Sequence, residues 1–157
     1  MVSTPGAHTS DILAAKFFYS AERLGGLLYE RFAAGLDHPD VVHAIKHMAG
    51  DEDQHARWYE EWLVEHGERA PTLDTSETVL VPTVNLLLSP RSLDKQLRTF
   101  AKGEATGARH LGALAERIRD PALRSIVLKT VPFERAHAEW YQRQGRSMLR
   151  PQDFKKR

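Results

Sequence analysis

Apolar residues along most of the chain recur every three or four positions, which is the spacing of an amphipathic α-helix. The pattern breaks at Gly67 and at two turns that each end in proline, Asp37-His38-Pro39 and Arg119-Asp120-Pro121. Proline is favoured at the first position of a helix, and glycine is common just after its end. Thr9, Ser10 and Asp11 are possible N-caps for the first helix. Four helices are therefore predicted, over residues 10–36, 39–66, 91–118 and 121–145.

The stretch between the second and third helices does not continue the helical pattern. Residues 68–90 contain the pairs Ala70-Pro71, Val81-Pro82 and Ser89-Pro90. An extended segment of this length can cross the length of a helix of about 27 residues, roughly 40 Å. We predict an all-α four-helix bundle with a long crossover between helices two and three, formed by one domain over residues 1–157. Val79-Leu80-Val81 and Leu86-Leu87-Leu88 are expected to pack on the side of this bundle.

Two Glu-x-x-His tetrads stand out on the inward faces of the second and fourth helices. They are Glu52-Asp53-Gln54-His55 and Glu134-Arg135-Ala136-His137. Residues i and i+3 of a helix project from one face, so each glutamate points the same way as its histidine. A further glutamate precedes each tetrad at the same spacing, Glu22 before Glu52 and Glu104 before Glu134.

The two halves of the chain are copies of one pattern, related by a constant offset without a gap. The offset pairs both glutamates, the histidine, the turn proline and the following Trp-Tyr of one half with those of the other. One tetrad alone would be unremarkable on an exposed helix, and repeats built for packing keep apolar positions rather than carboxylates. A buried glutamate also needs a partner or a metal. Four carboxylates and two imidazoles inside a bundle predict a di-metal carboxylate site.

Composition narrows the chemistry of such a site. The net charge is +1 and the chain has no cysteine. Near neutrality gives no support for nucleic-acid binding. The lack of cysteine excludes disulfides, thiolate metal sites and a rubredoxin-type iron centre. The sequence shows no membrane-spanning run and no signal-peptide core, so a cytoplasmic protein is expected.

The predicted ligands favour redox chemistry. Two divalent ions would balance the four glutamate charges, which makes their burial tolerable. Oxygen and imidazole ligands suit iron or manganese, and zinc is possible. Six protein ligands leave coordination positions open, where O2 or peroxide could bind. Hydrolysis is a weaker alternative.

The doubled pattern, a glutamate followed at one fixed spacing by Glu-x-x-His, resembles the ferritin-like superfamily of di-iron carboxylate proteins, including rubrerythrin, bacterioferritin and demethoxyubiquinone hydroxylase types. The resemblance covers residues 10–145 and implies a ferritin-like fold. It implies that two iron ions, or manganese, are bound, with Glu52 and Glu134 bridging them. The implied ligands are Glu22, Glu52, His55, Glu104, Glu134 and His137.

Two departures from these relatives limit what the resemblance implies. Rubrerythrins carry a further glutamate three residues after the third-helix ligand, where this chain has Gly107. Met48 lies one turn from a predicted ligand and does not indicate a haem site, so no haem is expected.

The function predicted from the sequence is an O2- or peroxide-activating di-iron oxidoreductase, an oxygenase or oxidase that acts on a small organic substrate. The alternative is a ferroxidase, iron-storage or rubrerythrin-like peroxide-scavenging protein. The expected partners are O2 or peroxide, a small-molecule substrate and an external electron donor. A homodimer is possible. No nucleic-acid partner and no membrane span are expected.

Small and aromatic residues beside the predicted ligands are further candidates for the site. Gly25, Gly26, Gly107 and Ala108 leave room for a substrate or O2 channel, with close helix packing as the alternative. Tyr59 and Tyr141 each follow a ligand glutamate by seven residues, so they are expected one turn from the metals. They either tune the site through a hydroxyl or simply pack in the core. Pro132 is expected to bend the fourth helix beside the site.

Overall fold

The computed structural model describes residues 8–73, 84 and 91–148 and shows an all-α four-helix bundle, as predicted. The helices are α1 (Thr9–Ala34), α2 (Pro39–Glu65), α4 (Leu93–Ala115) and α5 (Pro121–Ser147). The third predicted helix ends three residues earlier than expected, and the fourth ends two residues later. The predicted packing of Val79–Val81 and Leu86–Leu88 lies outside the described residues.

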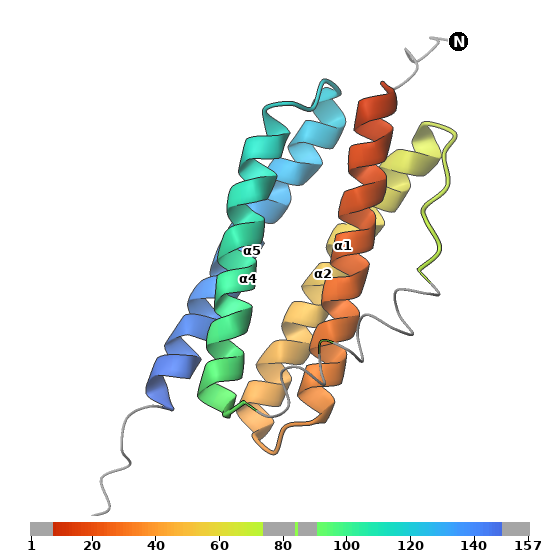
Figure 1. The fold of residues 1–157 in the computed structure, drawn as a ribbon. Helices are drawn as coiled ribbons and strands as arrows, with labels where there is room; N and C mark the ends of the chain where they lie inside the picture. The colour runs from red at the N-terminus through yellow and green to blue at the C-terminus, as the bar shows by residue number, and fades with distance from the viewer. Residues whose placement is uncertain (1–7, 74–83, 85–90, 149–157) are drawn as a thin grey trace, which may run out of the picture.

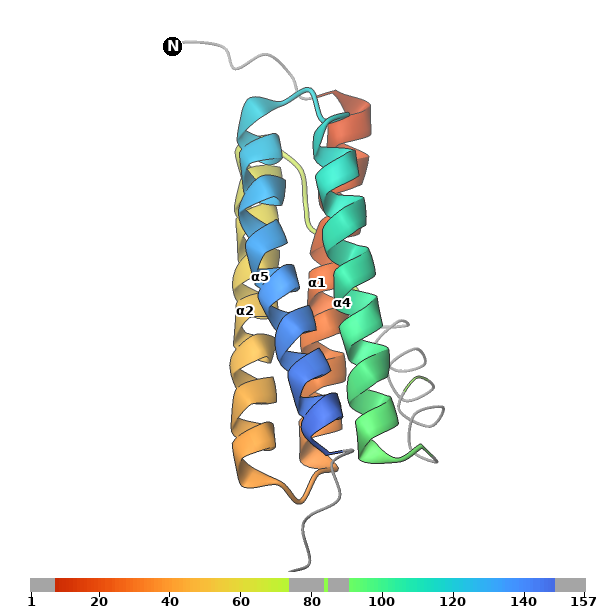
Figure 2. The same ribbon diagram turned by 90° about the vertical axis from the view of Figure 1, so that its left-hand side faces the viewer.

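The helices form two antiparallel pairs that lie side by side. α1 packs along α2, and α4 packs along α5 (Figure 1). Figure 2 shows α2 beside α5 and α1 beside α4, so the bundle has four seams. α2 and α4 run in the same direction, and α2 ends at the opposite end of the bundle from the start of α4. This arrangement requires a connection as long as the bundle, which agrees with the predicted crossover.

The turns at the helix ends follow the sequence signals. Pro39 and Pro121 occupy the first positions of α2 and α5. Gly67 has a φ angle of 75°, which a side chain would disfavour, and it lies just beyond α2. Asp120 caps α5, because its Oδ1 accepts a hydrogen bond of 2.8 Å from the backbone N–H of Leu123. Trp62 of α2 donates its indole N–H to the same oxygen at 3.0 Å.

Asp11 does not cap its own helix but fixes the opposite hairpin. α1 starts after His8, which makes no side-chain cap. Asp11 is 2% exposed, and its two oxygens accept backbone N–H groups of Arg119 at 3.3 Å and Asp120 at 2.9 Å. The start of α1 is thus tied to the turn between α4 and α5.

We expect Asp11→Ala to lower the free energy of unfolding by about 2 kcal/mol or more, because two buried backbone donors lose their acceptor. Chemical denaturation of the metal-free protein measures this change. Asp40→Ala, in the exposed first turn of α2, is the control and should change stability by less than about 0.5 kcal/mol. An equal effect of the two changes would contradict the role of Asp11.

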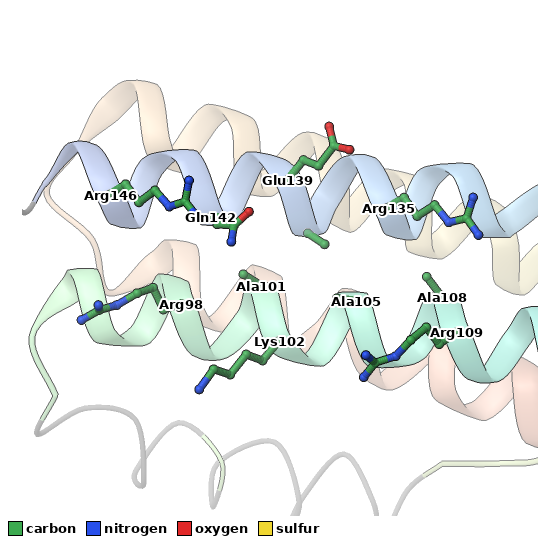
Figure 3. Close-up of a pocket in the computed structure, with 11 residues that line it drawn as sticks. Arg98, Ala101, Lys102, Ala105, Ala108, Arg109, Arg135, Glu139, Gln142 and Arg146 are labelled. Atoms are coloured by element: carbon green, nitrogen blue, oxygen red, sulfur yellow. The ribbon is translucent and has the colours of Figure 1, made fainter.

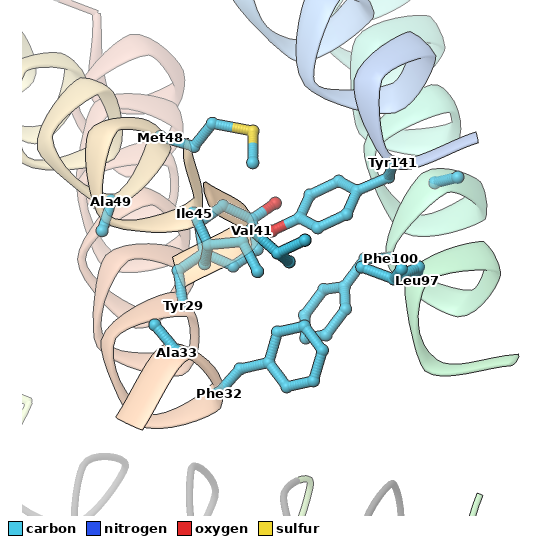
Figure 4. Packing of buried hydrophobic residues seen from close by; sticks show 11 residues of the cluster. Tyr29, Phe32, Ala33, Val41, Ile45, Met48, Ala49, Leu97, Phe100 and Tyr141 are labelled. Atoms are coloured by element: carbon cyan, nitrogen blue, oxygen red, sulfur yellow. The ribbon is translucent and has the colours of Figure 1, made fainter. Parts of the chain in front are cut away.

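Two apolar clusters fill the bundle and leave a polar layer between them. One cluster packs Tyr29 and Phe32 of α1 against Phe100 of α4 and Tyr141 of α5 (Figure 4). The other contains Phe18, Tyr59, Trp62, Leu123 and Val127. The predicted ligands lie near the middle of their helices, between these clusters. Burial of the two clusters provides the main drive for assembling the polar layer.

α5 continues as a helix through Pro132, two residues before the second tetrad. Proline has no backbone N–H, so the carbonyl of Leu128 lacks its usual helical donor there. The bend expected at this point stays a prediction. Within the described residues, no helix combines the length and apolar character needed to cross a membrane.

Candidate metal centre

All four helices contribute to one buried polar cluster in the middle of the bundle. α1 supplies Glu22, α4 supplies Glu104, and α2 and α5 each supply a glutamate and a histidine from their tetrads. Five of the six side chains are at most 7% exposed, and Glu104 is partly buried. The structure brings together Glu22, Glu52, His55, Glu104, Glu134 and His137.

The cluster divides into two overlapping groups. In each group, one oxygen or nitrogen atom per residue lies within 4.8 Å of the corresponding atoms of the others. The first group is Glu22, Glu52, His55 and Glu134, and the second is Glu52, Glu104, Glu134 and His137. Glu52 and Glu134 belong to both groups, so they are the two carboxylates that both groups share.

The two histidines repeat one geometry in the two halves. Nδ1 of His55 is 3.1 Å from Oε2 of Glu22 and 3.8 Å from Oε1 of Glu134. Nδ1 of His137 is 3.2 Å from Oε1 of Glu52 and 3.7 Å from Oε2 of Glu104. Each imidazole therefore directs Nδ1 toward one carboxylate that belongs to a single ligand group and one carboxylate that belongs to both groups. The carboxylate that belongs to both groups comes from the other tetrad.

Several of these inward atoms have no hydrogen-bond partner among the described residues. They are Oε1 of Glu52, Oε2 of Glu104, Oε1 of Glu134 and Nδ1 of His137. Buried polar atoms are almost always paired, because an unpaired one costs about 1–3 kcal/mol. Converging carboxylate and imidazole atoms of this kind fit divalent metal ions, since metal coordination satisfies them all at once. The cluster is consistent with a di-iron site.

Burial and neighbouring negative charge disfavour the charged forms of the glutamates in the cluster. Burial raises the pKa of Glu22 and of Glu52 to about 7. Burial and the neighbouring carboxylates of Glu52 and Glu104 raise the pKa of Glu134 to about 12. Without cations, the protein must keep protons on these groups. A pair of divalent ions would offset the effects of burial and of the neighbouring carboxylates by supplying positive charge.

The two histidines differ in charge preference. Burial lowers the pKa of His55. Burial also disfavours the charged form of His137, but the adjacent carboxylates of Glu104 and Glu52 outweigh it and raise its pKa to about 10. Metal binding would release the proton from His137.

The two histidines differ in the residue that contacts the ring on the side away from the carboxylate cluster. Nε2 of His137 is 3.1 Å from Oδ2 of Asp51, which orients the ring as carboxylates do for metal-bound histidines. The residue that matches Asp51 in the second half is Phe133, whose ring centroid is 4.9 Å from that of His55. Nε2 of His55 has no hydrogen-bond partner among the described residues. One histidine thus has an acceptor behind it, and the other an aromatic ring.

Tyr29 is a residue of the site that the sequence pattern did not single out. Its hydroxyl donates to Oε1 of Glu104 across the bundle. The signal was present, because Tyr29 follows Glu22 by seven residues, as Tyr59 follows Glu52. The match in the second half is Leu111, so this contact also exists on one side only. Asp51 was missed likewise, although it directly precedes a ligand glutamate.

Tyr59 and Tyr141 are fully buried, each within one of the two apolar clusters. Neither hydroxyl has a hydrogen-bond partner among the described residues. Burial raises the pKa of both phenols above the usual value, so both remain protonated at neutral pH. They can serve as donors to the site but not as bases.

We expect Tyr59→Phe and Tyr141→Phe each to retain full metal content. If a hydroxyl tunes the site, the rate of Fe(II) oxidation falls at least threefold, because the change removes only the donor and keeps the ring. Stopped-flow absorbance and metal analysis measure the two quantities. Phe18→Tyr, which adds a hydroxyl in the cluster that contains Tyr59, is the control for polarity alone. Unchanged rates in both variants would assign the tyrosines to packing.

The four small residues predicted to line a channel fall in three places. Gly25 and Gly107 face a pocket at the α1–α4 seam, with the shared carboxylates behind them. A Cβ at Gly25 would lie 3.0 Å from Oε2 of Glu52, and one at Gly107 would lie 3.6 Å from Oε2 of Glu134. Gly26 instead faces α2, where an added Cβ would lie 3.4 Å from the carbonyl oxygen of Ala49. Ala108 faces the α4–α5 seam.

This fold and cluster define the class of protein as a four-helix bundle with a carboxylate-rich dimetal centre. Comparison with protein-family models agrees, since the rubrerythrin family model matches residues 14–144, most of the chain. The chain belongs to the rubrerythrin family, within the ferritin-like di-iron carboxylate superfamily. Searches of curated proteins and of solved structures gave no match.

Proposed function

We propose that this protein reduces peroxide at a di-iron centre. The proposed ligands are Glu22, Glu52, His55, Glu104, Glu134 and His137, with Glu52 and Glu134 shared by both ions. The observation that carries the proposal is the pair of overlapping ligand groups. Family membership favours peroxide or ferroxidase chemistry over the oxygenase activity that the sequence analysis placed first.

When bound, two iron ions supply open coordination positions and one electron each. The residues of the chain would set the conditions for this chemistry. Four glutamates balance two divalent charges, and the apolar clusters on either side separate the polar layer from both ends of the bundle. Asp51 holds the ring of His137, and Tyr29 fixes Glu104 through its hydroxyl. These contacts fix the second ligand group more firmly than the first, so the two ions would differ.

The experiment is an anaerobic titration of the Fe(II)-loaded protein. We expect one equivalent of hydrogen peroxide to oxidise both ions, faster by at least tenfold than one equivalent of O2, as followed by absorbance and Mössbauer spectroscopy. Zinc-loaded protein is the inert control. Faster oxidation by O2 than by peroxide would overturn the peroxidase assignment.

Ferroxidase activity with iron storage is the second candidate, because the same centre oxidises Fe(II). Storage requires a closed shell and uptake of iron beyond two ions per chain. Gel filtration combined with iron loading separates the candidates. A small oligomer that stops at two iron ions per chain supports the peroxidase, and a large shell that takes up many supports storage.

A further inference from the structure

A pocket of about 240 Å³ opens at the seam between α1 and α4 and leads to the proposed metal centre. Its inner end is formed by the carboxylates of the cluster, and Gly25 and Gly107 form part of its walls. A glycine at each point leaves the carboxylates open to the pocket. It is therefore a direct route from solvent to the site.

The outer half of this pocket is apolar. Phe18 and Leu111 line its wall, and Phe17 and Leu114 line it further out. Phe17 is 63% exposed and Leu114 36% exposed, although both are large hydrophobic residues. His110 is the one lining residue outside the carboxylate cluster that can carry a charge. Iron entering from solvent would be served by carboxylates at such a mouth, and none is present among the lining residues there.

The pocket is also larger than hydrogen peroxide needs. A water molecule takes up about 30 Å³ of liquid, so the volume corresponds to about eight waters. An apolar wall gains nothing from a small polar oxidant, whereas it stabilises a hydrocarbon group by burying it. Size and lining thus match a molecule with a polar end directed at the carboxylates and an apolar end toward Phe17 and Leu114.

We infer that the preferred substrate is an organic hydroperoxide rather than hydrogen peroxide; this rests on the proposed peroxide reduction. In the balanced reaction, the O–O bond of ROOH breaks, and two electrons and two protons are taken up to give ROH and water. The electrons come from an external one-electron donor by way of the metal pair. The hydrocarbon group R occupies the α1–α4 pocket.

The test compares cumene hydroperoxide with hydrogen peroxide in the iron-loaded protein, and cumyl alcohol binding in the redox-inert zinc-loaded protein. We expect kcat/KM to favour cumene hydroperoxide at least tenfold. In the variant Phe17→Gln/Leu114→Gln, this ratio and the affinity for cumyl alcohol, measured by calorimetry, should each fall at least tenfold. The matched control is Val64→Gln/Leu128→Gln, which removes two exposed apolar residues elsewhere.

The outcomes separate this inference from the proposed function. Hydrogen peroxide turned over as well as cumene hydroperoxide would overturn the inference and leave peroxide reduction intact. No turnover of either peroxide would overturn the proposed function. In that case, cumyl alcohol binding to the zinc-loaded protein still tests whether the α1–α4 pocket binds an organic group. Equal affinity in the pocket variant and its control would overturn this role of the pocket, and loss of affinity in the pocket variant alone would support it.

Charge is distributed unevenly between the two hairpins of the bundle. Residues 8–73, which form the α1–α2 hairpin, contain twelve acidic and six basic residues, a net charge of −6. Residues 91–148, which form the α4–α5 hairpin, contain six acidic and twelve basic residues, a net charge of +6. The near-neutral total conceals this division, although the two hairpins share one pattern.

Part of the positive charge lines a groove of about 640 Å³ between α4 and α5. Ala101, Ala105 and Ala108 line its α4 side, while basic side chains extend along both helices (Figure 3). Lys102, Arg135 and Arg146 are exposed and have no carboxylate partner among the described residues. Arg135 directly follows the ligand Glu134, so the groove runs beside the metal centre.

We propose that an acidic electron-transfer protein docks on this groove and delivers the electrons that peroxide reduction requires. The cations extend over twelve residues on each helix, which is eleven steps of 1.5 Å, or about 16 Å. One small anion cannot contact a row of this length, but an acidic protein surface can. Entry of electrons here leaves the α1–α4 pocket free for substrate.

The probe is a plant-type ferredoxin, an acidic one-electron carrier, titrated against the metal-loaded protein by calorimetry at 20 and 200 mM salt. We expect binding that weakens at least tenfold at high salt and in Lys102→Glu/Arg135→Glu/Arg146→Glu. The control Arg31→Glu/Lys46→Glu/Arg57→Glu makes the same change in net charge on the other hairpin. Equal loss in both variants, no binding at low salt, or a salt-sensitive dimer of this chain lost in the groove variant would each overturn the proposal.

Discussion

Replacing Glu52 or Glu134 with alanine is expected to lower the metal content from two ions per chain to one or none. Each carboxylate belongs to both ligand groups, so its loss weakens both sites at once. Metal analysis after anaerobic loading with Fe(II) or Mn(II) gives the number. Glu60→Ala, on the exposed face of α2, is the control and should bind two ions.

A second measurement separates loss of ligands from loss of the fold. In the metal-free protein, Glu134→Gln removes a carboxyl group whose neighbours oppose its charge, so this variant should be more stable than the wild type at pH 8. A variant with fewer metal ions and a higher stability without metal is folded and lacks a ligand. Two bound ions in the double variant Glu52→Ala/Glu134→Ala would contradict the assigned site.

The metal-free protein is expected to lose stability as the pH rises from about 4.5 through 7. The pKa values of Glu22 and Glu52 are about 7 in the fold, against the usual value of 4.5 for a glutamate in an unfolded chain. Between these values the native state binds more protons than the unfolded state, so the free energy of unfolding falls with rising pH. For each of these two carboxyl groups, the raised pKa corresponds to a loss of stability on the order of 3 kcal/mol over this pH range.

The histidines modify this dependence in opposite directions. His137, with a pKa of about 10, adds to the loss above pH 6.5. His55, with a lowered pKa, opposes the loss below pH 6.5, because its unfolded form then binds more protons. The raised pKa values of three carboxyl groups have a larger effect on stability than the lowered pKa of His55. The net change is therefore a loss of several kcal/mol in the free energy of unfolding between pH 5 and 8.

Bound metal should reverse this trend. The ligands are then deprotonated and satisfied, and metal binds more tightly as competition from protons falls. The stabilisation by metal, seen as the difference in melting temperature with and without chelator, should therefore grow from pH 5 to 8. A metal-free stability that is flat over this range, or equal melting temperatures with and without chelator, would contradict a buried dimetal centre.

The bundle and the local half of each ligand set could be predicted from the sequence alone. Helical geometry fixes which residues share a face, so the inward position of Glu52 with His55 and of Glu134 with His137 follows from their spacing. The constant offset between the two tetrads then showed that both halves carry the same set. These relations connect residues of one helix or matching residues of the two halves, so they can be read directly from the sequence.

The contacts between the two halves could not be predicted from the sequence, because they depend on how the helices pack. His137 faces Glu52 of the other tetrad, Asp51 supports His137 while Phe133 packs against His55, and Tyr29 reaches Glu104. Likewise Gly25 and Gly107 line the pocket while Gly26 and Ala108 do not. Such contacts depend on the rotation of each helix about its axis and on its neighbour across the seam. Packing of the two apolar clusters sets both, and hydrophobic periodicity within one helix does not specify them.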